Sequence, residues 1–380
     1  MSDHDASRSS WFQRFILPGF AFKAVVIGGG YATGRELATF FLPSGPRGGL
    51  YGMLLSMAIW SVVCALTFLF ALQTRSLDYR TFFQHLLGRQ WPVFEALLAL
   101  ALIVILAVYA AAAGAIGHAL LAWPLVAGSM LLVVCVAVVA AFGNVAVEKL
   151  FKYVTYFLYA TYTLFVVLSL AHFGPRVEMA FEAPTATTGW ATGGLMYAGY
   201  NMTGAILILP VVRHMSGRRD AIISGLLAGP MAMLPAILFF ICMVGFYPQV
   251  VDEPLPSDYL LAKLDIPAFR VLFQAMIFAA LLESATGCIH AINERVAHAY
   301  SQSRGRTLSG RARLAVACGV LIVAVFVATR FGLVALIASG YRWLAIGILT
   351  VYVLPLITYG LWRIVRRNPE GMKADRPVIY

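Results

Sequence analysis

Ten runs of mostly apolar residues, each long enough to cross a bilayer, occupy most of the 380-residue sequence. A hydrocarbon layer about 30 Å thick needs roughly 20 apolar residues per helical span. The runs cover 17–42, 49–73, 91–119, 124–142, 150–173, 189–213, 219–246, 267–297, 312–329 and 343–362. Only 12% of the residues are charged, whereas a soluble domain averages about 25%. We therefore predict an all-α polytopic membrane protein with ten transmembrane helices.

The basic residues are distributed unevenly between the loops that join these runs. If the N-terminus is cytoplasmic, 21 of the 28 Lys and Arg residues fall on the cytoplasmic side. Loops rich in Lys and Arg stay in the cytoplasm, so both termini are predicted to be cytoplasmic. The net charge of +11 is then a topology signal, and no nucleic-acid partner is expected. No small-residue cleavage site follows the first run, which is predicted to be a retained span rather than a signal peptide.

The cysteines and histidines show no spacing that is typical of a metal site or a disulfide framework. All five cysteines fall inside predicted spans without a CxxC pair, so they are expected to be buried reduced thiols. The seven histidines form no HExxH motif. We expect no metal and no enzymatic activity, because no pair of nucleophile and base is recognisable in the sequence.

Span 1 contains an unusual glycine-rich stretch, AVVIGGGYATGRE, over residues 24–36. It is not a dinucleotide or P-loop motif, because Thr33 replaces the third glycine, Arg35 the lysine and Glu36 the metal-binding hydroxyl. Each glycine disfavours a helix by roughly 0.8–1.0 kcal/mol relative to alanine, so we predict unwinding at residues 28–30. The half-helix that begins near Thr33 would then direct its positive end inward. Close packing of helices through small residues is the alternative.

A second glycine-polar break and several shorter matches indicate an internal repeat. Span 6 contains YAGYNMTG over residues 197–204, and each break opens a group of five spans. In the same order, SLDY after span 2 matches SDY after span 7, and PVF at the start of span 3 matches PAF at the start of span 8. Two groups of five spans must cross the membrane in opposite directions. Interrupted spans in corresponding positions of inverted repeats indicate a transporter's binding site.

The spans predict the following organisation of the chain. It comprises a cytoplasmic tail (1–14), a first five-helix repeat (15–173), an extracellular or periplasmic loop (174–188), a second, inverted repeat (189–362) and a cytoplasmic tail (363–380). The segment 333–341, between spans 9 and 10, is too short to cross and is expected at the outer interface.

Three motifs carry a resemblance to a known family. GGGYATGREL in span 1, GYNMTGAILILP in span 6 and LLESATGCIHAINER in span 8 resemble the bacterial YkvI-type membrane proteins. These proteins are related to the amino acid–polyamine–organocation transporters. The resemblance implies the LeuT-type fold, two inverted five-helix repeats with spans 1 and 6 broken around the substrate. It also implies secondary transport of an amino acid or similar small solute across the bacterial cytoplasmic (inner) membrane.

The candidate substrate-binding residues lie at the two breaks and in span 3. They are Gly28, Gly29, Gly30, Tyr31, Thr33, Gly34, Tyr109, Tyr197, Tyr200, Asn201 and Thr203. Tyr109 lies near the middle of span 3, a region that faces the substrate in the LeuT-type fold; a packed aromatic with a satisfied hydroxyl is the alternative. Asn201 would be costly against lipid, which favours a place at the site. Span 1 has no acid–proline–glycine–asparagine motif, which argues against a divalent-metal carrier of the same superfold.

Two acidic residues within spans are candidates for coupling transport to an ion or a proton. Glu283 lies near the centre of span 8, where an ionisable group is costly unless it is paired or faces water. It could exchange a proton, bind a cation or pair with a substrate amine; a structural pair with a buried base is the alternative. Ser284 and Thr286 flank it. LeuT-type sodium sites use span 8 hydroxyls, but this pattern departs from the usual adjacent pair, so H⁺ and Na⁺ stay open as coupling ions.

Glu36 is the other acidic candidate, beyond the span 1 break. It could line the outer vestibule, coordinate an ion or form a buried salt bridge to a neighbouring span. The sequence therefore favours a secondary active transporter whose partners are a small solute and the lipid bilayer. A ligand sensor on the same scaffold, which binds a solute without moving it, is the second hypothesis.

Overall fold

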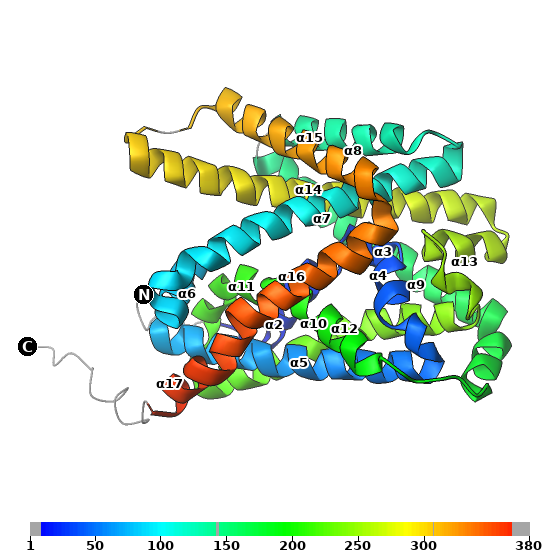
Figure 1. Cartoon of the computed structure of the whole chain (residues 1–380), viewed down its shortest axis with the longest axis horizontal. Coiled ribbons are helices and arrows are strands. Elements are labelled where there is room, and N and C mark those ends of the chain that lie inside the picture. Colours follow the sequence, from blue (N-terminus) through cyan, green and yellow to red (C-terminus); the bar gives the residue numbers. More distant parts are fainter. Residues whose placement is uncertain (1–8, 142–143, 307, 367–380) are drawn as a thin grey trace, which may run out of the picture.

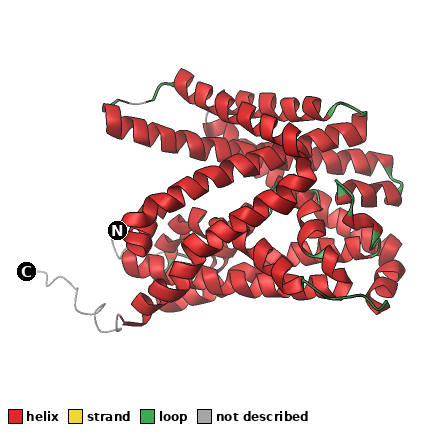
Figure 2. Ribbon diagram, viewed as in Figure 1, coloured by secondary structure: helices red, strands yellow, loops and turns green. Residues whose placement is uncertain are grey.

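The computed structural model describes residues 9–141, 144–306 and 308–366, and this part of the chain consists of helices and loops without a strand (Figure 2). Helical secondary structure is expected, because a backbone in hydrocarbon must satisfy its own hydrogen-bonding groups. Within this described part, six helical stretches are long and apolar enough to cross a membrane. They are Arg35–Thr74, Tyr79–Leu121, Tyr156–Glu182, Arg218–Val244, Pro267–Ser301 and Gly310–Arg366.

All ten predicted spans coincide with continuous or interrupted helices (Figure 1). Span 1 comprises α2 (Leu17–Val26), α3 (Gly29–Ala32) and α4 (Arg35–Phe40). Span 6 comprises α10 (Trp190–Asn201), α11 (Thr203–Leu207) and the 3-10 helix η4 (Leu209–His214). The other spans are α5 (Gly45–Thr74), α7 (Trp91–Leu121), α8 (Leu125–Ala141), α9 (Asn144–Glu182), α12 (Arg218–Val244), α14 (Pro267–Arg304) and α15 (Gly310–Ala335). Span 10 combines α16 (Tyr341–Ile348), the π-helices η7 (Leu349–Val353) and η8 (Leu356–Gly360), and α17 (Leu361–Arg366).

Short helices join or precede the spans. They are η1 (Phe12–Ile16), η2 (Leu42–Ser44), α6 (Tyr79–Leu87), η3 (Gly88–Gln90), η5 (Gln249–Val251) and α13 (Pro256–Leu264). Helix α6 begins after Asp78, whose carboxylate accepts a hydrogen bond from the Thr81 N–H. Such a cap satisfies one of the N–H groups that a helix leaves free at its start.

The structure shows helix in two segments for which the sequence predicted no span. Helix α9 continues through Pro175 to Glu182, so the first part of the predicted loop 174–188 is helical. The segment 333–341 is also helical, because the π-helix η6 (Leu336–Gly340) connects α15 directly to α16. Its Ile337 is fully buried.

Glycines of α12 allow this helix to approach α5 closely. A Cβ placed on Gly225 of α12 would lie 2.3 Å from the Cα of Ala65 in α5, and one on Gly229 would lie 2.4 Å from the Met57 carbonyl oxygen. Contacts this close leave no room for a side chain, and small residues at helix interfaces are typical of membrane bundles. The α5–α12 pair therefore packs backbone against backbone.

Large apolar side chains are exposed on the outside of the bundle. Phe326 is 68% exposed and Trp343 is 72% exposed. In water such a surface would favour association, whereas in a bilayer it faces lipid. Together with the apolar helices, these side chains identify a multi-pass membrane protein. The five cysteines are free thiols.

Candidate functional site

Span 1 is interrupted twice near its middle. Ile27 (φ −82°, ψ 71°) ends α2, Gly28 (φ −89°, ψ 178°) is extended, and Gly34 (φ 78°, ψ −8°) separates α3 from α4. A positive φ is unfavourable for residues with a Cβ, which explains glycine at position 34. The span is broken where the glycines predicted it, but Gly29 and Gly30 are not in the unwound part. They begin α3.

Span 6 is interrupted less sharply. Between α10 and α11, Met202 keeps helical dihedral angles (φ −64°, ψ −18°), and α11 is only 5 residues long. The Met202 N–H bonds to the Gly199 carbonyl at 3.2 Å, so the helix narrows to a three-residue turn at this point. The break is therefore a change of helical type rather than an extended segment.

The two polar residues predicted at this break bind the end of α10. Asn201 Nδ2 donates to the Tyr197 carbonyl at 3.0 Å, and Thr203 Oγ1 donates to the Tyr200 carbonyl at 3.0 Å. Carbonyls at a helix end lack partners within the helix, so these side chains stabilise the interruption. Each of the two side chains is 8% exposed.

A hydrogen bond joins the two interrupted spans. Tyr200 Oη donates to Glu36 Oε2 over 2.5 Å, and Glu36 is 5% exposed. The Tyr200 ring lies 4.5 Å from the Tyr341 ring and 5.7 Å from the Tyr197 ring, measured between centroids. In the described part of the chain, no ion pair involves Glu36. Glu36 thus lies among tyrosines at the junction of spans 1 and 6, and not in a salt bridge between described residues.

Tyr109 lies beside the first break of span 1. A Cβ placed on Gly28 would be 2.7 Å from Tyr109 Oη and 3.6 Å from Ser284 Oγ. Tyr109 Oη and Ser284 Oγ therefore both lie close to the backbone of Gly28. The structure therefore brings together three predicted residues from spans 1, 3 and 8. The Tyr109 hydroxyl faces the break.

Glu283 borders a small cavity between spans 1, 5 and 8. The cavity has a volume of about 60 Å³ and is lined by Ala24, Ile27, Leu158, Tyr159, Ala280, Glu283 and Ser284. A water molecule needs about 10–15 Å³ on this scale, so the space suits waters or one ion and not an organic solute. No ion pair of Glu283 occurs between residues that the structure describes. The structural ion pair considered from the sequence is not found among them.

Thr286 lies apart from this cavity. Its Oγ1 donates to the Leu282 carbonyl at 2.7 Å, and the residue is buried. Residues two apart on a helix do not share a face, which separates it from Ser284. Among the described residues no cluster of three or more His, Cys, Asp or Glu side chains could hold a metal ion.

Two tyrosines near the breaks were missed by the sequence reasoning. Tyr162 Oη of α9 donates to the Pro235 carbonyl at 2.8 Å and lies 3.4 Å from Tyr31 Oη. Tyr341 begins α16 and packs against Tyr200. The signal that selected Tyr109, a tyrosine in the middle of a span, also applies to Tyr162. It does not apply to Tyr341, which falls in the segment expected at the interface.

Residues that follow the first break hold the segment before α13 against span 1. Arg35 Nη1 donates to the carbonyls of Val251 and Glu253, each at 2.8 Å. The Ser257 N–H donates to the Thr33 carbonyl at 3.0 Å. Arg35 and Thr33 therefore attach the loop before α13, and the first turn of α13, to the interrupted helix.

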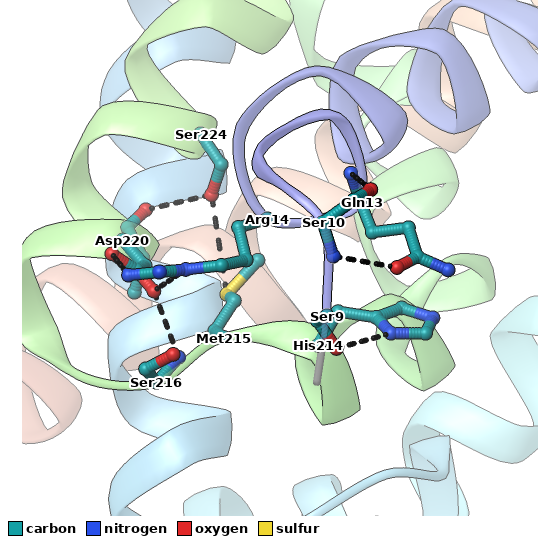
Figure 3. Close-up of polar contacts among 10 residues, drawn as sticks. Ser9, Ser10, Gln13, Arg14, His214, Met215, Ser216, Asp220 and Ser224 are labelled. Atoms are coloured by element: carbon teal, nitrogen blue, oxygen red, sulfur yellow. Dashed lines mark hydrogen bonds and ion pairs between the residues drawn. The ribbon is translucent and has the colours of Figure 1, made fainter. Parts of the chain in front are cut away.

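An ion pair connects the N-terminal segment to α12 at the other end (Figure 3). Arg14 donates to Asp220 through Nε at 2.8 Å and through Nη2 at 2.9 Å. Asp220 also accepts from the Ser216 N–H at 2.8 Å, and Ser9 Oγ lies 3.1 Å from His214 Nδ1. Bidentate pairs of arginine and carboxylate are strong and directional. We call the Arg14–Asp220 pair the N-terminal latch.

Comparison with solved structures places this geometry in a known fold. The crystal structure of MhsT in complex with L-phenylalanine matches with a TM-score of 0.64 and 16% sequence identity, over 94% of this chain and 97% of that chain. A manganese transporter from Eremococcus coleocola matches more distantly, with a TM-score of 0.42 and 15% identity over 95% of this chain and 87% of that chain. No protein-family model and no curated protein matches the sequence. The chain has the LeuT-type fold that it shares with MhsT, as predicted.

Proposed function

We propose that the protein is a secondary active transporter that binds a small solute between interrupted spans 1 and 6 and moves it by alternating access. The observation that carries the proposal is the Tyr200–Glu36 hydrogen bond, by which buried polar groups from two broken helices meet inside an apolar bundle. Irregular backbone at membrane depth is tolerated where it is enclosed by protein or lines a cavity. In transporters with inverted repeats, such paired breaks form the binding site.

The solute we propose is an amino acid or a related compound. MhsT, which shares the fold, was crystallised with L-phenylalanine, and the sequence motifs resemble the YkvI-type relatives of amino acid transporters. The side chains at the breaks fit such a solute, because tyrosine hydroxyls and the Glu36 carboxylate offer polar contacts among aromatic rings. Tyr109, Tyr200 and Asn201 are each 8% exposed. We propose that these three side chains contact the solute, because each keeps a small exposed area at the breaks.

We assign the coupling step to Glu283 and its cavity. Burial of an isolated charge is costly, so this carboxyl favours a state in which a proton or a cation is bound. The cavity of about 60 Å³ also contains Ser284 and borders the end of α2 at Ile27. Occupation by H⁺ or Na⁺ would therefore act on the same backbone that forms the first break. This contact provides a physical connection between ion binding and solute binding.

Alternating access requires that the site open to one side of the membrane while contacts on the other side keep it closed, and then the reverse. The N-terminal latch lies on the side that the basic loops predict to be cytoplasmic, and the Arg35 contacts lie on the opposite side. We propose that the site opens to the cytoplasm when the Arg14–Asp220 ion pair breaks. It opens to the outside when the segment before α13 separates from Arg35. On this proposal the protein resides in the bacterial inner membrane with both termini cytoplasmic.

Uptake into proteoliposomes tests the proposal. Purified protein would be reconstituted and assayed with radiolabelled amino acids under an imposed proton gradient, an imposed sodium gradient or neither. Accumulation that depends on one gradient is expected. Saturable solute binding without uptake under any gradient would instead establish a sensor.

Substitution of Glu283 tests its role in coupling. Glu283→Gln keeps the size of the side chain but removes its charge and its ability to exchange a proton, so gradient-driven uptake should fall to background. Exposed Glu178 provides the control, and Glu178→Gln should transport like the wild type. Wild-type uptake by Glu283→Gln would refute the assignment, whatever the solute.

A further inference from the structure

A second, larger cavity lies beside the N-terminal latch. It has a volume of about 330 Å³ and is lined by Trp11, Arg14, Phe15, Arg219, Asp220, Ile223 and Leu227. This is the lower end of the size range of small-molecule sites. The cavity lies between the N-terminal segment and the first turns of α12, and none of its lining residues belongs to the breaks of spans 1 and 6. The transport proposal uses Arg14 and Asp220 as the latch but assigns no ligand to the space beside them.

The polarity of the cavity changes along α12. Arg219, Ile223 and Leu227 are spaced by four residues, so they lie on one face of the helix. Arg219 is exposed at the start of the span, and the two aliphatic residues follow it one and two turns deeper. Phe15 adds an aromatic ring to the lining. The cavity is therefore charged at the membrane surface and apolar toward the membrane interior.

The charge at the mouth of the cavity is positive. Asp220 neutralises Arg14 through the latch, whereas Arg218 and Arg219 form no ion pair with any described residue. Exposed Trp11 borders the same opening, and tryptophan is enriched at the level of lipid headgroups. The opening thus combines an arginine that pairs with no described residue and an exposed aromatic residue.

We propose that this cavity binds one anionic phospholipid, with its phosphate on Arg219 and the upper part of an acyl chain along Ile223 and Leu227. A free phosphate would use the arginine but leave the apolar wall unfilled. A zwitterionic lipid would match the wall but bring no net negative charge to the arginines. From the membrane surface inward, the cavity presents arginine first, then an aromatic ring and then aliphatic side chains. This order matches an anionic lipid, whose charged headgroup lies at the surface and whose acyl chain extends inward.

The bound lipid would support the latch. Its acyl chain would fill the space between the N-terminal segment and α12, and these are the two elements that Arg14 and Asp220 connect. Opening of the latch separates the walls of the cavity and removes the site. Anionic lipid therefore favours the state in which the latch is closed. This effect of the lipid does not depend on which solute is transported.

Native mass spectrometry of the full-length protein with phosphatidylglycerol and phosphatidylcholine tests the proposal. Phosphatidylglycerol is expected to bind the wild type more tightly. Arg219→Ala should weaken phosphatidylglycerol binding about five-fold, since one basic side chain at a membrane surface contributes about 1 kcal/mol. Arg330 is exposed and has no ion-pair partner among the described residues. Arg330→Ala is the matched control and should bind like the wild type.

A second variant tests the apolar wall. Ile223→Trp would fill the cavity while leaving every arginine in place, and it should lose phosphatidylglycerol binding to the same extent. Equal binding of the two lipids by the wild type, or equal losses in the Arg219 and Arg330 variants, would overturn the proposal. So would a large gain of lipid binding on replacing both Asp3 and Asp5 by Asn, because the N-terminal tail would then be the occupant.

Discussion

The contact between Gly28 and Tyr109 allows a quantitative test of the first break. The Gly28 dihedral angles (φ −89°, ψ 178°) are accessible to alanine, so Gly28→Ala introduces no backbone strain. Its cost comes from the new methyl group, which would lie 2.7 Å from Tyr109 Oη. Overpacking of this kind costs about 1–3 kcal/mol. We expect the variant to be destabilised by that amount.

Removal of the hydroxyl should relieve the collision. Tyr109→Phe alone removes the hydroxyl of a buried side chain, at a cost of about 1 kcal/mol. In the double variant the methyl group occupies the space that the hydroxyl vacates, so its stability should match that of Tyr109→Phe. Neighbouring residues that share a space are non-additive in this way, with coupling of about 0.5–3 kcal/mol.

These stability differences can be measured by thermal unfolding of the detergent-solubilised variants. Unfolding is followed with a thiol dye that reacts with the buried cysteines as they become exposed. Gly319→Ala is the control, because Gly319 lies inside α15 with no atom within 4 Å of a Cβ placed there. That substitution should be neutral or stabilising. A Gly28→Ala variant as stable as the wild type, or strictly additive losses in the double variant, would refute the account of the contact.

Three further outcomes follow from local geometry. Gly34→Ala should lower the unfolding midpoint more than Gly319→Ala, because a left-handed φ of 78° costs a residue with a Cβ about 1–2 kcal/mol; equal midpoints would contradict this. Asp220→Asn should increase hydrogen exchange of the amides in residues 10–16, because the latch that holds η1 is lost; unchanged exchange would show that apolar packing suffices. Gly229→Leu should prevent folding, since its side chain would meet the α5 backbone at 2.4 Å; a normally folded variant, judged by size-exclusion chromatography, would disprove that contact.

The breaks could be anticipated from sequence because glycine and polar residues are rare in the middle of apolar spans. The same signal located the tyrosines at positions 109, 197 and 200, and the general fold followed from the number and arrangement of the runs. The conformation of each glycine in the first break could not be predicted from the sequence. Consecutive glycines tolerate both helix and extended backbone, so only packing determined that Gly28 is extended while Gly29 and Gly30 start α3.

Long-range partners were the other part that sequence could not supply. Glu36 was placed by counting along a straight helix, but the second interruption at Gly34 redirects α4, and the carboxylate meets Tyr200. Tyr341 lies in the segment 333–341, which was expected at the outer interface because it is too short to cross the membrane. In the structure the chain remains helical there, and its buried face is set by contact with α10.

The backbone-to-backbone contact between α5 and α12 limits how the bundle can deform. Side chains at an ordinary helix interface can change rotamer as helices slide, but Gly225 and Gly229 have none to adjust. A small displacement along the axis would force carbonyl oxygens and α-carbons into each other. The two helices therefore form one mechanical element, and any movement that separates Arg14 from Asp220 must displace the N-terminal segment relative to this rigid pair.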